Sequence, residues 1–464
     1  MNVVTRFAPS PTGYLHIGGV RTALFNYIYA KQNKGTFLVR IEDTDAERSK
    51  EEYVDAILDG LNWLNLSPDL APIRQSTRYE IYQKNAYALL DSGAAYRCNC
   101  SHERLQKLRD EQESKGIKPA YDGHCRDKDI KDENSVIRIK SLKEGETIVD
   151  DQVYGSISFP NKELDDLIIL RSDGSPTYHF CNVIDDNEQG VTHIIRGEDH
   201  LPNTPRQIQI VNALGYKGFN YAHLPLVLGE DRKRLSKRHA ATDLMAYKEQ
   251  GYLPDALLNM LARLGWSKID KDVFTTEEVI QFFDFNDVQR AGAVFDLGRL
   301  NFINQEHLAL KTDDELINLI KPFAEKEGID LDEHHDPEKL LRLCIGSGNN
   351  LAEIAQFIVP FLRRYDHYED ECFEKFLADS ETVLKFFYNN LKNLAVWNEA
   401  EISTVIDQAK TDLSLPMPKI GMPMRAALLG RTKSPPLDAT IYLFDQEEVL
   451  ERISLTLEKV TSQH

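Results

Sequence analysis

A strand, a stiff turn and a helix near the start of the chain set strong limits on its fold. Val3–Ala8 is predicted to be a short strand rich in apolar residues, and the sequence Pro-Ser-Pro-Thr-Gly follows it. Prolines fix φ and glycine permits unusual backbone angles, so this segment is a turn. Gly18–Lys34 then places apolar residues at helical spacing, and Thr36–Ile41 is a second strand. This order predicts a nucleotide-binding strand–helix–strand unit with a parallel sheet.

Polar residues follow both strands. Ser10 and Glu42 lie just after the two strand ends, and in open α/β sheets ligands bind beyond the carboxyl ends of the strands. We therefore expect both to face one crevice. His16 precedes Gly18 and Gly19, which open a helix whose free N–H groups and dipole attract phosphates. Alone, this histidine pattern is most often a turn with a surface histidine, but the complete run is far more specific.

A basic loop follows much later, with the sequence Arg234-Leu235-Ser236-Lys237-Arg238. An isolated charge run of this kind is usually a solvated loop. Combined with the first motif, it predicts that Lys237 lies against triphosphate oxygens, because nucleotidyl transfer needs cations aimed at the phosphate charge.

The two motifs resemble, in this order, the HIGH and KMSKS signatures of class I aminoacyl-tRNA synthetases. The first run and Arg40–Asp45 are similar to the bacterial glutamyl-tRNA synthetase in particular. Two positions depart from the signatures: Gly19 replaces a histidine, as is common in the glutamyl branch, and Arg234 replaces the leading lysine, which keeps charge but not geometry. The resemblance covers most of the chain, continuing through Ser175–His179, Asn182–Asp186, Ile195–His200 and, more weakly, Pro423–Gly430.

The resemblance implies a glutamate–tRNA ligase. Such an enzyme uses ATP, which arrives with Mg²⁺, to convert L-glutamate to glutamyl-adenylate. It then passes the glutamyl group to the 3′-terminal adenosine of tRNA(Glu), and AMP and diphosphate are released; tRNA must bind before glutamate is activated. His16 and Lys237 are the implied catalytic residues, stabilising ATP phosphates.

The resemblance also implies two sets of binding residues. Those for ATP are Pro9, His16, Gly18, Gly19, Glu198, Leu235, Ser236 and Lys237. Those for glutamate are Arg6, Ala8, Ser10, Glu42, Tyr178, Asn182 and Arg196. Arg6 and Arg196 suit a dicarboxylic substrate, since arginine binds carboxylate through two parallel hydrogen bonds, and Glu42 suits the substrate ammonium. Without the motif, Arg6 would more simply be a surface residue at a strand end.

The implied fold class is an α/β Rossmann-like catalytic core with an α+β insertion, followed by mostly α-helical C-terminal domains. We expect the core at 1–80 and 180–240, and an acceptor-stem-binding insertion at 81–179 that does not continue the core sheet. A stem-contact region at 241–310 and anticodon-binding domains at 311–464 follow. Helical spacing supports the last part; it occurs at Ala256–Leu264, Thr276–Phe283, Asp313–Glu327 and Ser380–Lys392. Leu224–Leu228 is expected to be one further core strand.

Three of the six cysteines cluster, at Cys98, Cys100 and Cys125. Three thiols suit a tetrahedral zinc ion, given a fourth ligand. Some bacterial relatives carry a histidine two residues after the third cysteine, and Asp127 occupies that position here. His124 or Tyr121 could take its place, and the zinc would be structural. The alternative is three thiols that bind no metal.

Acidic residues also cluster, but we expect them to pair with arginines or cap helices rather than to bind a metal. These residues are Asp43, Asp45, Asp185 and Asp186. The net charge of −19 argues against non-specific nucleic-acid binding but leaves room for a folded RNA that meets one basic face. The chain shows no secretory leader and no bilayer-length apolar run. We therefore expect a cytoplasmic monomer that binds no membrane.

Three rivals remain. One is a tRNA-modifying relative, which would resemble the catalytic half alone. Another is a different HIGH-type nucleotidyltransferase, such as a cytidylyltransferase, and the third is a non-catalytic RNA-binding paralogue. The choice of tRNA also stays open. Ile345–Asn350 aligns loosely with a region used to read the anticodon and contains no arginine, which hints that tRNA(Gln) is charged too.

Overall fold

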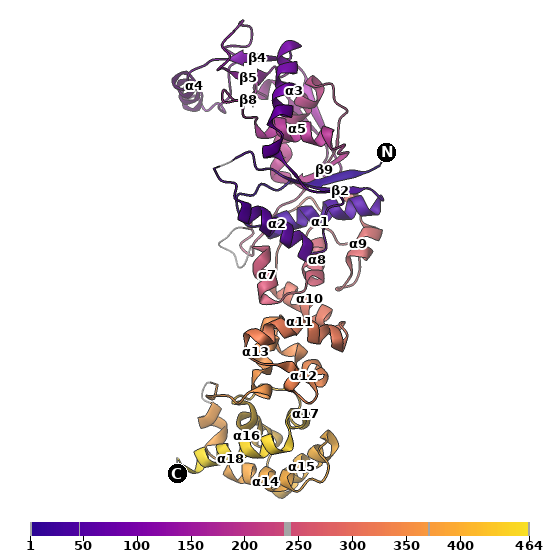
Figure 1. The fold of residues 1–464 in the computed structure, drawn as a ribbon, viewed down its shortest axis with the longest axis vertical. Coiled ribbons are helices and arrows are strands. Elements are labelled where there is room, and N and C mark those ends of the chain that lie inside the picture. Colours follow the sequence, from indigo (N-terminus) through magenta and orange to yellow (C-terminus); the bar gives the residue numbers. More distant parts are fainter. Residues whose placement is uncertain (1, 46, 236–242, 370–371, 463–464) are drawn as a thin grey trace. The chain divides into compact units, whose positions relative to one another are not determined.

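The protein is described here by a computed structural model covering residues 2–45, 47–235, 243–369 and 372–462. The chain divides into two compact units (Figure 1). The N-unit comprises Met1–Tyr247 and Pro254–Leu297, and the C-unit comprises Lys248–Leu253 and Gly298–His464. Among the described residues, no helix combines the length and apolar character needed to cross a bilayer.

The first half of the N-unit core is the predicted strand–helix–strand unit. β1 (Val4–Phe7) pairs in parallel with β2 (Thr36–Ile41), which pairs in parallel with β3 (Ile73–Arg74). α1 (Ile17–Gln32) connects β1 to β2 and packs on their sheet, as Figure 1 shows. α2 (Glu51–Trp63) follows β2. The expected Rossmann-like arrangement is confirmed.

The second half adds β9 (His193–Gly197), α6 (Thr204–Ala213) and β10 (Asn220–Leu224), and the two strands are again parallel. The halves join where the backbone N–H of Thr192 donates to the carbonyl oxygen of Val4 at 2.9 Å. The expected single strand at 224–228 is wrong. Pro225 has no N–H to give a sheet, so β10 ends at Leu224 and β11 (Val227–Leu228) pairs with β12 (Ala293–Val294) instead.

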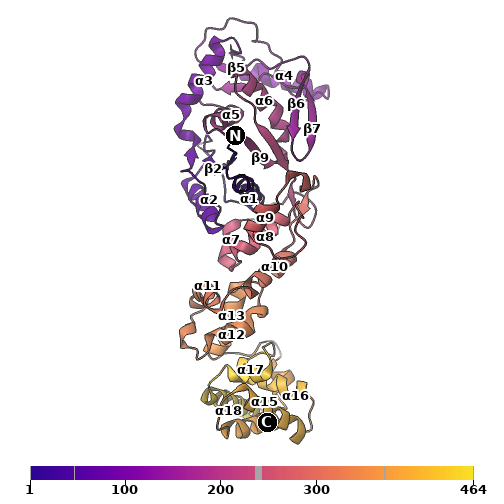
Figure 2. The same cartoon turned by 90° about the vertical axis from the view of Figure 1, so that its right-hand side faces the viewer.

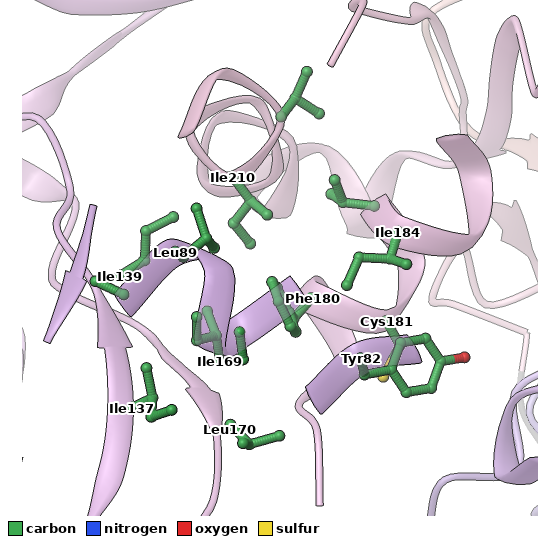
Figure 3. Packing of buried hydrophobic residues seen from close by; sticks show 14 residues of the cluster. Tyr82, Leu89, Ile137, Ile139, Ile169, Leu170, Phe180, Cys181, Ile184 and Ile210 are labelled. Carbon is green, nitrogen blue, oxygen red and sulfur yellow. The ribbon is translucent and has the colours of Figure 1, made fainter. Parts of the chain in front are cut away.

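Much of the segment between the halves forms a separate antiparallel sheet. Its strands are β4 (Ala95–Cys98), β5 (Val136–Ile139) and β8 (Ile168–Leu170). α3 (Tyr79–Asp91) and α5 (Tyr178–Glu188) cover it, while α4 (His102–Ser114) buries none of its side chains. Figure 3 shows the apolar core between sheet and helices, where Phe180 is fully buried.

The expectation that this segment does not continue the core sheet is wrong for one hairpin. β6 (Glu146–Asp151) and β7 (Gly155–Pro160) are antiparallel, and β6 also pairs with β10, where Asp151 lies opposite Tyr221. In β6 buried and exposed residues alternate, which is the pattern of a strand on a sheet with one covered face. The hairpin therefore brings Asp151 to the core.

Helices complete both units. In the N-unit, α8 (Pro254–Arg263) and α9 (Thr276–Phe282) contact α1, as Figure 2 shows. α7 spans Leu244–Gln250. The described residues of the C-unit contain no strand, as the helical spacing predicts. The C-unit helices are α10 (Leu297–Ala309), α11 (Asp313–Lys326), α12 (Pro337–Cys344), α13 (Leu351–Leu362), α14 (Glu381–Lys392), α15 (Glu399–Asp412), α16 (Met417–Leu429), α17 (Leu437–Tyr442) and α18 (Gln446–Ser462).

Removing the ring at the centre of the insertion core should weaken the N-unit. Phe180→Ala leaves a cavity among side chains that collapse only in part, so we expect a loss of about 3–5 kcal/mol in the free energy of unfolding. Urea unfolding followed by circular dichroism measures it. Phe282→Ala is the matched control, because the Phe282 side chain is 48% exposed, and its loss should stay below about 1 kcal/mol. Equal losses in both variants would contradict the assignment of this core.

Candidate active site

A cavity of about 700 Å³ opens in the N-unit beyond the ends of β1 and β9 and beside the start of α1. Residues separated by more than two hundred positions line it. The structure places most of the predicted site residues around this one space: Arg6, Ala8, Ser10, His16, Gly18, Gly19, Glu42, Tyr178, Asn182, Arg196 and Leu235. They come from both halves of the core and from α5, so only the tertiary fold brings them together.

Two of the described residues predicted to bind ATP, Pro9 and Glu198, are not among the lining. Glu198 is turned to other partners: its Oε1 accepts the backbone N–H of Leu226 at 2.9 Å, and its Oε2 accepts the hydroxyl of Tyr154. Glu198 therefore orders the segment between β10 and β11. Ser236 and Lys237 lie outside the described residues.

The start of α1 offers backbone donors to the cavity. His16 is the N-cap residue in an extended conformation, and its side chain does not cap the helix. The first turn contains no acidic side chain. Helix N-termini attract anions through free N–H groups and the helix dipole, and an acidic side chain would compete for them. The arrangement therefore suits phosphate oxygens next to Gly18 and Gly19.

Arg6, on β1, is bound through Nε, while its two terminal nitrogens are available to a ligand. Its Nε donates to Oδ1 of Asp186 at 3.0 Å, and its side chain is only 4% exposed. Neither Nη atom has a hydrogen-bond partner among the residues that the structure describes. Both terminal nitrogens thus remain for a carboxylate in the cavity.

Arg40, which sequence reasoning missed, organises this side of the site. It is fully buried on β2 and donates through Nη1 to Oδ1 of Asp186 at 2.7 Å and through Nη2 to Oδ1 of Asn182 at 2.8 Å. Its Nη2 also lies 3.4 Å from Oε1 of Glu42. The sequence signal was an arginine between apolar residues in a strand, since such a residue must find partners when buried.

The acidic residues of this network differ in their ionisation. Burial would raise the pKa of Asp186, but Arg40 and Arg6 hold it below its usual value. Burial raises the pKa of Glu42, and Arg40 and Arg6 offset this only in part. Asp186 is therefore a firm anion that fixes two arginines. A further positive charge in the cavity would therefore favour the ionised form of Glu42.

The acidic residues considered as a metal cluster pair with arginines instead. Asp185 binds Nε of Arg78 at 2.8 Å, and Asp43 binds Nε of Arg74 at 2.9 Å. Asp45 lies 2.6 Å from Nη2 of Arg48. Within the described part of the chain, only the cysteines form a group with metal-binding geometry.

Arg196, on β9, is a buried cation without a counter-ion in contact. Its Nε donates to Nε2 of His223 at 3.2 Å and its Nη2 donates to Oγ1 of Thr204 at 2.8 Å. It is 6% exposed and forms no ion pair with any described residue, and Nη1 has no hydrogen-bond partner among them. Burial lowers its pKa. An unpaired buried charge is costly, so the geometry suits an anionic ligand against Nη1.

The three clustered thiols, which do not line the cavity, lie at the end of β4 and in the loops before and after α4. Their sulfur atoms lie within 4.8 Å of one another, and Cys100 Sγ and Cys125 Sγ are 3.5 Å apart. The hydroxyl of Tyr121 completes the group, at 3.4 Å from Cys98 Sγ and 3.6 Å from Cys100 Sγ. Burial opposes ionisation of Cys98, yet Tyr121 and Arg138 help to lower the pKa of this thiol to about 7.

The other two candidates for a fourth ligand point elsewhere. Asp127 is exposed, and its carboxylate is not part of the thiol group. His124 is exposed as well, and its Nε2 lies 2.6 Å from Nζ of Lys128. Tyr121 is the one candidate that the fold buries against the sulfurs, with the Arg138 guanidinium 3.8 Å above its ring.

The cavity thus offers two open arginines, a buried carboxylate and the N–H groups of a helix start. Two cations suit a ligand with two carboxylates, and the carboxylate suits an ammonium. The helix start suits a phosphorylated partner. An amino acid with an acidic side chain and a nucleotide together carry this set of groups.

Comparison with known proteins places the site in a family. Residues 2–302 match the family model described as tRNA synthetases class I (E and Q), catalytic domain, and residues 315–457 match an anticodon binding domain. The chain is 43% identical over 463 residues to glutamate–tRNA ligase 2 of Halorhodospira halophila, with 98% of each chain covered. It is 44% identical over 459 residues to glutamate–tRNA ligase 1 of Acidithiobacillus ferrooxidans, again with 98% of each covered.

A solved structure agrees with the sequence relatives. The crystal structure of a glutamate tRNA ligase from Elizabethkingia meningosepticum in complex with its amino acid superposes with a TM-score of 0.89. Its sequence identity is 31%, and the match covers 99% of this chain and 100% of that one. With a catalytic-domain match over more than half its length and full-length relatives, the chain belongs to the class I tRNA synthetases of the glutamate and glutamine branch.

Proposed function

We propose that this protein is a glutamate–tRNA ligase that activates L-glutamate with ATP and transfers it to the 3′-terminal adenosine of tRNA(Glu). The observation that carries the proposal is the meeting of Arg6, Arg196 and Glu42 around one cavity. These residues form the charge complement of glutamate. The full-length relatives with this activity support the proposal.

Glutamate binding follows from the charges. Arg6 and Arg196 each present free N–H groups, which suit the two carboxylates of the substrate. Glu42 takes the ammonium, and that positive charge favours the ionised form of a carboxyl whose pKa burial has raised. Ala8, Ser10, Tyr178 and Asn182 shape the rest of the pocket.

Activation needs no protein nucleophile. The α-carboxylate of glutamate attacks the α-phosphorus of ATP in line and expels diphosphate, so catalysis consists of positioning and charge stabilisation. The start of α1, with Gly18, Gly19 and His16, receives phosphate oxygens, and Lys237 adds a cation. Mg²⁺ arrives with ATP and is held mainly by its phosphates.

Transfer brings in tRNA. A ribose hydroxyl of the terminal adenosine attacks the carbonyl carbon of the adenylate, and AMP leaves. We assign acceptor-stem binding to the insertion at 81–179, stem contact to 241–310 and anticodon binding to 311–464, where the anticodon-domain match lies. We infer that the enzyme acts as a cytoplasmic monomer. The absence of arginine in Ile345–Asn350 favours charging of tRNA(Gln) as well.

The thiol group fits a structural zinc ion. Three mutually close sulfurs can supply three ligands of a tetrahedral ion, and the buried Tyr121 oxygen, 3.4 and 3.6 Å from two of them, supports it as the fourth. We therefore propose Cys98, Cys100, Cys125 and Tyr121 as the ligands. Such an ion would tie β4 to the loop that carries Tyr121 and would take no part in the reaction.

Charging assays test the function directly. Purified tRNA isoacceptors are incubated with ATP and labelled glutamate, glutamine or aspartate. We expect glutamate to be attached to tRNA(Glu), and also to tRNA(Gln) if the anticodon is read loosely. Diphosphate exchange with CTP in place of ATP would favour the cytidylyltransferase alternative.

Lys237→Ala should slow tRNA-dependent ATP–diphosphate exchange by about 100-fold or more, because it removes a cation aimed at the phosphates. Lys233→Ala is the matched control, since Lys233 is an exposed lysine four residues earlier in the sequence, and its rate should stay near that of the unaltered protein. A near-normal rate for Lys237→Ala would refute the role assigned to Lys237, and an unaltered protein without exchange activity would argue for the non-catalytic alternative.

Arg196→Ala should raise KM for glutamate by about 100-fold, because the substrate loses a charged hydrogen-bonding partner in a buried site. KM for ATP should change little and serves as the internal control. A parallel rise of both constants would indicate damage to the fold instead of loss of a glutamate contact.

Metal analysis by mass spectrometry of protein purified without chelators should find about one zinc ion per chain. Tyr121→Phe should lower zinc affinity, while Asp127→Ala and His124→Ala leave it unchanged, because both side chains lie outside the sulfur group. Zinc loss on changing Asp127 but not Tyr121 would refute the proposed ligand set.

A further inference from the structure

Arg196 donates hydrogen bonds to two buried neutral side chains, His223 and Thr204, neither of which lines the cavity. Arg196 on β9 and His223 on β10 are paired positions in the parallel register, so their side chains stand next to each other on one face of the sheet. Thr204, at the first turn of α6, receives Nη2 of the same guanidinium. His223 and Thr204 are fully buried.

The hydrogen bond from Arg196 assigns the His223 ring protons. A guanidinium is a donor only, so Nε2 of His223, 3.2 Å from Arg196 Nε, must be the acceptor. The proton of a neutral ring then sits on Nδ1, which lies 2.6 Å from Oδ2 of Asp151. The Thr204 hydroxyl oxygen lies 3.1 Å from Nε2 of His223 and 3.4 Å from the carbonyl oxygen of His200. When Thr204 donates its proton to His200, Nε2 of His223 accepts from Arg196.

Asp151 is itself fixed in place. Its Oδ2 also accepts the backbone N–H of His223 at 3.0 Å, and its Oδ1 accepts those of Val153 and Tyr154, both at 2.9 Å. Burial opposes ionisation, yet the hydrogen bonds from His223 and the backbone hold the pKa of Asp151 below its usual value. Burial, with Arg196 nearby, lowers the pKa of His223. The pair is therefore a carboxylate and a neutral imidazole.

This arrangement keeps the positive charge of Arg196 available. A carboxylate in direct contact with Arg196 would occupy its N–H groups and neutralise it, as Asp186 partly does for Arg6. Here the carboxylate stands one imidazole ring away, so it compensates a buried cation without touching it. The Nη1 edge of Arg196 stays open toward the cavity.

We propose that His223, held by Asp151 with its proton on Nδ1, is a positioning residue that aims Arg196 at the side-chain carboxylate of the substrate and thereby supports the preference for glutamate over glutamine. The inference rests on the proposed function and deepens it. Because the acceptor next to Arg196 is neutral, the guanidinium keeps its full positive charge. That charge attracts the side-chain carboxylate of glutamate more strongly than the neutral amide of glutamine. Asp151 acts through His223, and neither residue touches the substrate.

The test compares two substitutions of similar size in the full-length protein. His223→Leu removes the acceptor, while His223→Gln retains a neutral acceptor oxygen. Steady-state charging of tRNA gives kcat and the KM values for glutamate and ATP, and exchange assays with glutamine give the selectivity. For His223→Leu we expect KM for glutamate to rise by about 10- to 100-fold, as for loss of a hydrogen bond to a charged group, with little change for ATP.

Recovery by the conservative substitution separates positioning from a structural role. His223→Gln should regain most of the affinity for glutamate and of the selectivity against glutamine. If it performs no better than His223→Leu, or if KM for glutamate and ATP rise together, the proposal is overturned. An unaltered protein that fails to charge tRNA with glutamate would instead overturn the proposed function on which it rests.

The ring protons can be read without any activity measurement. In the ¹⁵N NMR spectrum of histidine-labelled protein, the His223 signals are those missing from His223→Gln. They should show a protonated Nδ1 and a bare Nε2. A protonated Nε2 would overturn the proposal, and this result stands even if His223→Leu does not fold.

Discussion

The ion pair between Arg40 and Asp186 supports the rest of the site, because it joins elements that meet only after folding. Arg40 stands on β2 and Asp186 on α5, and the same carboxylate oxygen binds Arg6 on β1. Removing one partner from such a buried pair would leave an uncompensated charge, which is far more costly than losing a surface salt bridge. The pair thus favours a single arrangement of β1, β2 and α5, and with it the placement of Arg6, Glu42 and Asn182.

The two arginines of the cavity are supported in different ways. Arg6 is bound by a carboxylate that Arg40 also holds, so part of its charge is already balanced. Arg196 is bound by neutral partners, and the nearest carboxylate in its network, Asp151, lies beyond the ring of His223. A site with one balanced and one open cation can bind an amino acid with two carboxylates, and among the described residues the open cation pairs with none of the site's own carboxylates. The hairpin of β6 and β7 supplies Asp151 and so allows Arg196 to be supported through His223.

Departures from expectation have local physical causes. Pro225 has no backbone N–H to donate to a neighbouring strand. The segment expected as one strand therefore forms parts of two, β10 and β11. β6 has an alternating pattern that suits a half-covered sheet, and it joined the core although it lies within a segment expected to stand apart. Glu198 was expected near ATP, but its carboxylate accepts hydrogen bonds from the backbone N–H of Leu226 and from the Tyr154 hydroxyl.

Local sequence determined the elements and the chemistry each one could carry: the turn after β1, the glycines that open α1, and the helical spacing of the C-unit follow from prolines, glycines and apolar periodicity. Motif resemblance then singled out most of the residues that line the cavity. Arg40, His223 and Thr204 escaped notice, because nothing near them in the chain shows what they contact. Their partners lie across strands and helices, and only tertiary packing decides which buried donor meets which acceptor. A buried polar group must be satisfied wherever the fold places it, and that place is set by the whole sheet rather than by its neighbours in sequence.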